Sequence, residues 1–182
     1  NIMKIFPAID IKDKKCVRLV KGNFDDKTEY ETSPINQAGK YKNHGFKNLH
    51  IVDLDGALTG KIVNIDIIQK IVGKYDLKVE VGGGIRTIDD IKKYINIGVD
   101  KVILGSAAIR NKEFLKEACI KFKNKIALGL DAKKGNLSVF GWKEDLNIKT
   151  LDFLKDIKDY GVSRLIYTDI NRDGTKESPN FE

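Results

Sequence analysis

Two pairs of short stretches in this chain resemble each other at long range. Asp131 follows Asp10 by 121 residues, and Ala8-Ile9-Asp10-Ile11-Lys12 is similar to Gly129-Leu130-Asp131-Ala132-Lys133. Val52-Asp53-Leu54-Asp55-Gly56 is likewise similar to the stretch 168–174, where Asp169 follows Asp53 by 116 residues. Such a repeat predicts two halves of four strand–helix units, which together close an eight-stranded (β/α)8 TIM barrel. The repeat therefore favours a barrel over a doubly wound sheet.

Apolar strands alternate with amphipathic helices along the chain, which indicates an α/β fold with a parallel sheet covered on both faces. Three predicted helices end in a glycine just before a strand, at Gly45, Gly98 and Gly161, as helix C-caps commonly do. Strands are predicted over 4–10, 48–53, 79–81, 101–104, 126–131 and 164–169. Helices are predicted over 34–43 and around 67–75, 88–95, 114–122 and 151–157, with a long polar loop to about residue 32 and another around Trp142.

The 182 residues suit one domain with a substantial core. We expect residues 3–182 to form a single (β/α) barrel domain to which this chain supplies about six βα units. Its last predicted strand is then the sixth, so the C-terminal quarter of the barrel is expected to be missing. Asn1 and Ile2 precede Met3 and are expected to be a cloning remnant.

Composition excludes several classes of protein. The net charge is +7, but the lysines are interspersed with acidic residues and form no basic stripe with aromatic residues, so we expect no nucleic-acid partner. No apolar run approaches the roughly 20 residues of a membrane helix, and the N-terminus lacks a signal-peptide core, so we expect no membrane association. Cys16 and Cys119 are isolated thiols, typical of packing residues in a reducing cytoplasm, where we expect the protein to reside.

A glycine triplet follows the predicted strand 79–81 and leads directly into a helix. Glycines let backbone N–H groups approach a ligand closely, and a helix N-terminus favours an anion. The next strand also ends in small residues, Gly105 and Ser106. These two strand ends predict a phosphate site that includes Gly83 and Gly84, although a triplet of this kind also suits a tight turn.

Asp10 and Asp131 each come at the end of an apolar strand, and strands one and five of an eight-stranded barrel lie opposite each other. Such an aspartate can simply cap the following turn. A matched pair at the carboxyl ends of barrel strands is instead typical of an active site. Two carboxylates on either side of a bound sugar can divide the work of a general base and a general acid.

A set of motifs covering residue 3 to the end of the chain resembles one enzyme family in order and spacing. The motifs are Phe6-Pro7-Ala8-Ile9-Asp10, Val17-Arg18-Leu19, Ile51-Val52-Asp53-Leu54-Asp55-Gly56-Ala57, Val81-Gly82-Gly83-Gly84-Ile85-Arg86, Leu104-Gly105-Ser106-Ala107-Ala108, Gly129-Leu130-Asp131-Ala132 and Tyr167-Thr168-Asp169-Ile170-Asn171-Arg172-Asp173-Gly174-Thr175. They resemble the phosphoribosylformimino-aminoimidazole carboxamide ribotide (ProFAR) isomerases of histidine biosynthesis. The sister cyclase of imidazole glycerol phosphate synthase typically has Cys-Leu-Asp at strand one, where this chain has Ala8-Ile9-Asp10.

The resemblance implies an Amadori rearrangement of an aminoaldose, ProFAR, to an aminoketose, PRFAR, with no metal and no organic cofactor. By this resemblance Asp10 is the proton acceptor and Asp131 the proton donor. Thr168 and Asp173 match positions that support the chemistry. Related enzymes leave open whether Asp131 or Asp173 is the general acid.

The resemblance also implies a small substrate with a phosphate at each end and, for a full-length protein, a monomer. Its substrate-binding residues would be Gly83, Gly84, Gly105 and Ser106 at one phosphate, Arg18 and His50 near the substrate, and Trp142 in a lid that stacks on the imidazole ring. His50 could equally be a satisfied core histidine, and Trp142 an ordinary loop anchor.

Two other functions fit the same residues. The first is a dual-substrate isomerase that also rearranges phosphoribosylanthranilate, as some barrel relatives do. The second is a non-catalytic phosphate-binding barrel, against which the two strand-end aspartates argue because a pure binder does not need opposed carboxylates.

Overall fold

The computed structural model describes residues 3–20, 23–139 and 144–172. The chain forms two compact units, which are described here one at a time. The first contains Asn1–Val17 and Glu29–Ile103, and the second contains Arg18–Thr28 and Leu104–Glu182. Among the described residues, no helix combines the length and apolar character needed to cross a membrane.

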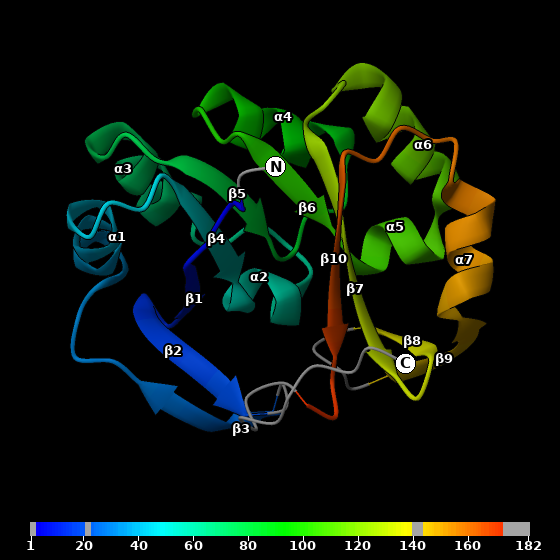
Figure 1. The fold of residues 1–182 in the computed structure, drawn as a ribbon, viewed down its shortest axis with the longest axis horizontal. Helices are drawn as coiled ribbons and strands as arrows, with labels where there is room; N and C mark the ends of the chain where they lie inside the picture. Colours follow the sequence, from blue (N-terminus) through cyan, green and yellow to red (C-terminus); the bar gives the residue numbers. More distant parts are fainter. Residues whose placement is uncertain (1–2, 21–22, 140–143, 173–182) are drawn as a thin grey trace. The chain divides into compact units, whose positions relative to one another are not determined.

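The first unit is built on parallel strands. β1 (Ala8–Lys12), β4 (Asn48–Asp53), β5 (Lys78–Gly82) and β6 (Lys101–Leu104) pair in that order, each parallel to the next (Figure 1). β2 (Lys15–Val20) folds back on β1 through Lys15, Cys16 and Val17 as an antiparallel hairpin, whereas the rest of β2 and most of β3 (Asn23–Glu29) belong to the second unit. The predicted parallel sheet is thus confirmed here, with an antiparallel hairpin that sequence analysis did not anticipate.

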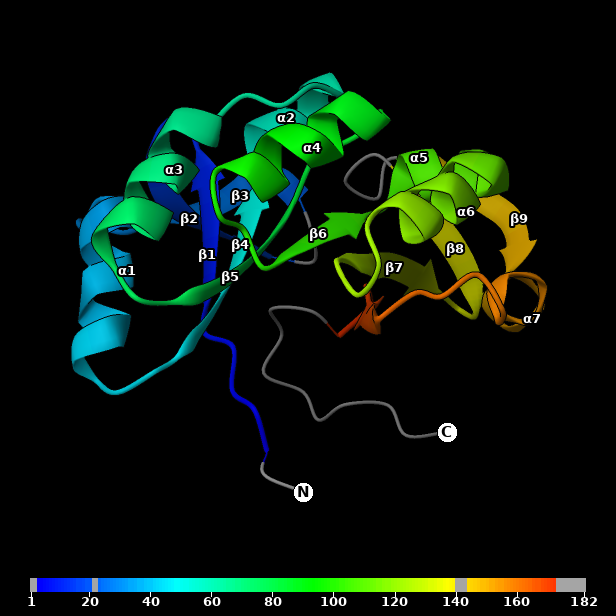
Figure 2. The same cartoon turned by 90° about the horizontal axis from the view of Figure 1, so that it is seen from above.

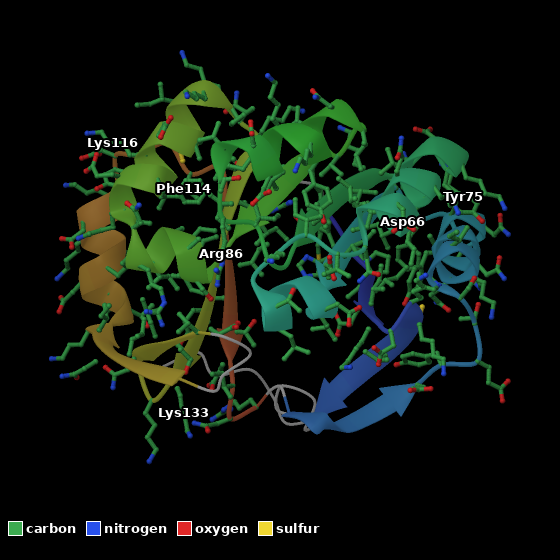
Figure 3. The ribbon with its side chains drawn as sticks, turned by 180° about the vertical axis from the view of Figure 1, so that it is seen from behind. Asp66, Tyr75, Arg86, Phe114, Lys116 and Lys133 are labelled. Carbon is green, nitrogen blue, oxygen red and sulfur yellow. The ribbon has the colours of Figure 1, made fainter. Side chains whose placement is uncertain are left out.

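Helices α1 (Pro34–Asn43), α2 (Leu54–Thr59), α3 (Ile65–Lys74) and α4 (Ile88–Asn96) connect these strands. Ser33 is the N-cap of α1, and its side chain accepts a hydrogen bond from Asn36 N, while α4 begins with a capping box of Thr87 and Asp90. α1 and α3 lie side by side (Figures 1 and 2). Tyr75, at the end of α3, reaches α1 (Figure 3), where Gly39 leaves room for its ring because a Cβ there would meet Tyr75 Oη at 2.5 Å.

The second unit contains α5 (Ser106–Arg110), α6 (Lys112–Lys121), β7 (Ile126–Lys133), β8 (Asn136–Val139), β9 (Glu144–Lys149), α7 (Thr150–Ile157) and β10 (Arg164–Asp169). β7 pairs with β10 in parallel on one side and with β8 in antiparallel fashion on the other, and β9 continues beyond β8. Lys112 Nζ lies 2.8 Å from Asp156 Oδ2 and links α6 to α7, which are neighbours in Figure 1.

Each unit has its own apolar core, formed where one face of its strands meets helices. In β4 the burial alternates, with Leu49 and Ile51 fully buried and His50 between them partly exposed, as expected for a strand with two different faces. The buried core residues of the first unit include Ile9, Ile11, Leu49, Ile51, Ile68, Ile71, Val81, Ile91 and Tyr94; those of the second include Leu104, Leu115, Ile126, Leu128 and Leu130.

The predicted C-cap glycines are confirmed at Gly45 and Gly98, which directly follow the C-cap residues of α1 and α4. The prediction was wrong for Gly161, because α7 ends at Ile157 with Lys158 as its C-cap. Gly45, Gly98 and Gly161 all have positive φ, at 90°, 97° and 90°, a conformation that favours glycine. The glycine signal worked at Gly45 and Gly98 because the backbone at a helix end demands this conformation whatever the tertiary context.

Several predicted boundaries were wrong. The first strand begins at Ala8 rather than residue 4, and the predicted polar loop to residue 32 contains β2 and β3. Polar and charged residues dominate β3, so its strand character comes from hairpin pairing and left no apolar pattern to read. The helix predicted over 151–157 begins one residue earlier, at Thr150.

Candidate functional site

Asp10 and Asp131 lie in two hairpins with the same internal geometry. In β1–β2 the register pairs Asp10 with Val17, and in β7–β8 it pairs Asp131 with Ser138. The two register partners, Val17 and Ser138, are 121 residues apart in the sequence, like the two aspartates. The turns also correspond, because the central residues have positive φ in both hairpins: 51° and 63° at positions 13–14, and 51° and 77° at positions 134–135. The repeat seen in the sequence is therefore a repeat of backbone structure.

The half-buried Asp10 is surrounded by apolar register partners. Val17 lies across the hairpin, and Val52 is the partner on the parallel neighbour β4. Cys16, adjacent to Val17, is buried, and the pKa of its thiol is raised to about 11, first by burial and second by the negative charge of Asp10. The negative charge of Asp10 therefore disfavours the thiolate form of Cys16 in the same hairpin.

Asp131, also half-buried, has hydroxyl-bearing register partners on both sides. Ser138 lies opposite it in β8 and is buried, while Thr168 is its partner in the parallel strand β10. Side chains in register on neighbouring strands share one face of the sheet about 5 Å apart. The structure therefore brings together Asp131 and Thr168, two of the predicted catalytic residues. Asp173, the alternative acid, lies outside the described residues.

His50 lies on the same sheet face as Asp10. The registers align Ala8, His50 and Glu80 across three strands and, two residues further on, Asp10, Val52 and Gly82. His50 Nδ1 is 2.6 Å from Glu80 Oε1, and Glu80 is almost completely buried. His50 is therefore held by a specific hydrogen-bond contact within the sheet.

The predicted phosphate turn packs tightly against the segment that follows β4. Gly83 and Gly84 have φ of 111° and 76°. A Cβ on Gly83 would collide with the Asp53 carbonyl, and one on Gly84 would lie 2.6 Å from the Gly56 carbonyl and collide with that of Lys61. Backbone packing thus accounts for both glycines without a ligand, as the tight-turn interpretation anticipated, and phosphate binding there stays a prediction.

The N-terminus of α4, next to this turn, is already capped by an acidic side chain. Asp90 Oδ2 accepts hydrogen bonds from the backbone N–H groups of Arg86 and Thr87, at 3.0 and 3.1 Å. Asp90 thus supplies the negative charge that sequence analysis expected from a phosphate at this helix end. The Arg86 side chain lies beside α2 (Figure 3), where a Cβ on Gly60 would collide with its guanidinium.

Asp53 organises the segment that packs on the glycine turn. Its fully buried carboxylate caps α2 through Gly56 N at 2.9 Å and accepts from Val63 N, Asn64 N and Asn64 Nδ2 at 3.0, 2.9 and 2.7 Å. Asn64 Nδ2 also donates to Asp55 Oδ2, which accepts from Asp13 N in the β1–β2 turn at 3.1 Å. Asp53 thereby ties the region around the glycine turn to the hairpin that carries Asp10.

The remaining predicted binding residues are less defined. Gly105 precedes the five-residue helix α5, and Ser106 is its first residue. Arg18 is exposed on β2. Trp142 lies outside the described residues. In the described part of the chain, no three His, Cys, Asp or Glu side chains gather in a way that could hold a metal ion.

Sequence analysis missed Glu80, Ser138, Asn64 and the role of Asp53 as a network centre. Glu80 gave a usable signal, because a charged residue inside the apolar run 79–81 is costly to bury without a partner. No sequence pattern pointed to Ser138 or Asn64, because both lie in segments that were predicted to be loops.

Comparison with known proteins identifies the family. Residues 4–182 match the family described as "Histidine biosynthesis protein". The chain is 79% identical over 180 residues to a Pelagibacter ubique protein named 1-(5-phosphoribosyl)-5-((5-phosphoribosylamino)methylideneamino)imidazole-4-carboxamide isomerase, covering 99% of this chain and 75% of that protein. The chain belongs to the ProFAR isomerase family of histidine biosynthesis.

More distant members of this family carry the same name. A Listeria welshimeri isomerase is 48% identical over 180 residues, covering 99% of this chain and 75% of that protein. A Desulfitobacterium hafniense isomerase is 45% identical, covering 99% and 72%. The family has the TIM-barrel fold, and the mixed α/β structure with parallel strands agrees with it.

Proposed function

We propose that this chain is an isomerase that converts the aminoaldose ProFAR into the aminoketose PRFAR, with Asp10 as the general base and Asp131 as the general acid. The observation that carries the assignment is the pair of matched hairpins, which gives the two aspartates equivalent positions within β1 and β7, each two residues before the end of its strand. Family membership supports the reaction itself. Asp173 remains the alternative acid.

The reaction needs acid–base groups at two stages. The acid protonates the furanose oxygen while the C1–O bond breaks and the nitrogen lone pair forms the C1=N bond of a Schiff base. The base then removes the C2 proton; the electron pair of that C–H bond forms C1=C2 while the C1=N pair returns to the nitrogen, which gives an enolamine. The C2 hydroxyl then loses its proton to form the C2 carbonyl as a proton adds to C1, which gives the aminoketose. A positioned acid or base contributes about 10²–10⁴-fold to such a step.

We infer that Gly83, Gly84, Gly105 and Ser106 bind one phosphate of the substrate, that Arg18 and His50 contact its remainder, and that Trp142 stacks on its imidazole. The net charge of +7 supports attraction of a doubly phosphorylated anion. We further propose that β1, β4, β5, β6, β7 and β10 are six strands of the family's eight-stranded barrel, because all their described pairings with one another are parallel.

Isomerisation of purified ProFAR by this chain and by its Asp10→Asn and Asp131→Asn variants tests the proposal. Each variant should lower kcat by at least about 10²-fold with folding unchanged. Asp76→Asn is the matched control, because the Asp76 side chain is fully exposed. Turnover of Asp10→Asn within tenfold of the parent would remove its assignment as the base. Phosphoribosylanthranilate in a parallel assay separates the single-substrate from the dual-substrate enzyme.

A further inference from the structure

The pair formed by His50 and Glu80 joins two neighbouring parallel strands at the same register position. Nδ1 of His50 lies 2.6 Å from Oε1 of Glu80, and the side chains are 20% and 5% exposed, respectively. The carboxylate is thus enclosed, and the imidazole is the member of the pair that retains contact with solvent.

This pair lies on the same face of the sheet as Asp10, on strands β4 and β5 next to β1. The register Ala8–His50–Glu80 comes two residues before the register Asp10–Val52–Gly82 in the direction of the strands. Side chains two residues apart on a strand share a face, so His50 and Asp10 face the same side. A substrate that reaches Asp10 from this side therefore meets His50 rather than the enclosed Glu80.

The chemistry of the two groups determines where the proton lies. An ionised carboxylate only accepts hydrogen bonds, so Nδ1 must donate to Glu80. A neutral imidazole carries one N–H, and once that proton is on Nδ1 the other nitrogen, Nε2, is an acceptor. An imidazole without such a partner has no fixed preference for this tautomer.

We propose that Glu80 is a positioning residue that holds the proton of neutral His50 on Nδ1 and so presents Nε2 as an acceptor for a hydroxyl group of the sugar substrate. The identity of the substrate rests on the proposed isomerase function. The tautomer of His50 does not depend on that function, so the tautomer and the contact with the substrate can be tested separately.

The chain contains only two histidines, which makes the tautomer directly measurable. In ¹⁵N-histidine-labelled protein, at a pH where both rings are neutral, long-range ¹H–¹⁵N correlations should show the proton of His50 on Nδ1. His44 is the internal reference, because its Nδ1 lies 2.6 Å from the Lys40 carbonyl on the exposed end of α1. A wild-type spectrum with the proton of His50 on Nε2 would overturn the proposal, whatever the enzyme activity.

Two substitutions of Glu80 separate positioning from packing. Glu80→Ala removes the acceptor and should move the His50 proton toward Nε2, while Glu80→Gln keeps a neutral acceptor and should shift the Nδ1 resonance less. The spectrum of His44 should stay the same in both. If Glu80→Ala does not fold, Glu80→Leu also removes the acceptor, and a His50 proton that stays on Nδ1 in that variant would overturn the proposal.

Kinetics of the same variants test the consequence for the substrate. Loss of a hydrogen bond to a charged partner predicts a fall in kcat/KM of about 10- to 100-fold for Glu80→Ala, with partial recovery in Glu80→Gln. Glu117→Gln is the control, because Glu117 pairs with Lys121 on the exposed surface of α6. A shifted tautomer with unchanged kcat/KM would overturn the role toward substrate, and absence of activity in the parent chain would instead count against the isomerase proposal.

Discussion

Asp10 and Asp131 occupy the same register position of two repeated hairpins, yet their neighbours differ in polarity. Val17 and Val52 flank Asp10, whereas Ser138 and Thr168 flank Asp131. Hydroxyl groups can donate to a carboxylate and fix its orientation, and valines cannot. One backbone position has thus been given two different chemical environments, as expected where two carboxyl groups carry different tasks.

The hydroxyls beside Asp131 should matter for turnover. We expect Ser138→Ala and Thr168→Val each to lower kcat by about 10- to 100-fold with a smaller effect on KM, the loss of one hydrogen bond to a charged group. Steady-state kinetics with ProFAR measures this. Ser163→Ala is the control, since its hydroxyl donates to the Ile126 carbonyl at 2.7 Å at the start of β7, away from Asp131. Unchanged kcat in both variants would show that these hydroxyls do not support Asp131.

The glycine turn should tolerate no side chain, even without a ligand. Gly83→Ala combines a φ of 111° with a collision against the Asp53 carbonyl, so we expect it to destabilise the fold by at least about 2 kcal/mol. Gly45→Ala is a matched control because its φ is also positive, at 90°, but a Cβ there meets nothing within 4 Å. Its cost should be about 1 kcal/mol. Urea unfolding of both variants checks the difference, and equal costs would contradict the packing explanation.

The buried carboxylate of Asp53 should stabilise the fold of the first unit. Asp53→Asn replaces a buried carboxylate that accepts four hydrogen bonds by an amide that must present a donor to the same N–H groups. We expect a loss of about 2–4 kcal/mol in the free energy of unfolding, measured in urea. Asp66→Asn, on the exposed first turn of α3 (Figure 3), should cost less than about 1 kcal/mol. If Asp53→Asn also lowered the free energy of unfolding by less than about 1 kcal/mol, Asp53 would not be the centre of this hydrogen-bond network.

The sequence was most informative where a local physical constraint determined the structure. Gly45 and Gly98 were predicted from the positive φ that helix ends favour, and the spacing of Asp10 and Asp131 predicted an internal repeat, which the structure shows as two similar hairpins. Strand β3 was not predicted because polar and charged residues dominate it, and its pairing across a hairpin is a tertiary property. In β9 only Leu146 and Ile148 alternate with polar residues, a pattern too short to separate a strand from the loop predicted there.

The candidate site was predictable only in part, for a related reason. Asp10, Asp131 and Thr168 follow from strand ends and family motifs, and the structure places Thr168 in register with Asp131. The contact between His50 and Glu80 joins residues 30 positions apart, so it depends on the register of β4 and β5, which composition does not specify. Asp90 shows why phosphate binding at the glycine turn stays a prediction, because the backbone N–H groups before α4 already donate to a side chain of that helix.

Cys16 should report the charge of Asp10. Burial and the Asp10 carboxylate raise the pKa of the Cys16 thiol to about 11, so replacing that carboxylate in Asp10→Asn should lower the thiol pKa while burial keeps it above its ordinary value near 9. Thiolate absorbance against pH measures this, in a Cys119→Ser background that removes the other buried thiol.

The same shift predicts how stability depends on pH. The folded chain keeps the Cys16 proton up to about pH 11, whereas the unfolded chain releases it near pH 9, so between these values the folded state binds more protons. The contribution of Cys16 to the free energy of unfolding is therefore present below pH 9 and lost as the pH rises to about 11. Cys16→Ala should flatten this part of the stability profile relative to the parent, and Asp10→Asn should narrow the pH range over which stability falls. Identical profiles for the parent and Cys16→Ala, together with a Cys16 titration that Asp10→Asn leaves unchanged, would show that the Asp10 charge does not act on this thiol.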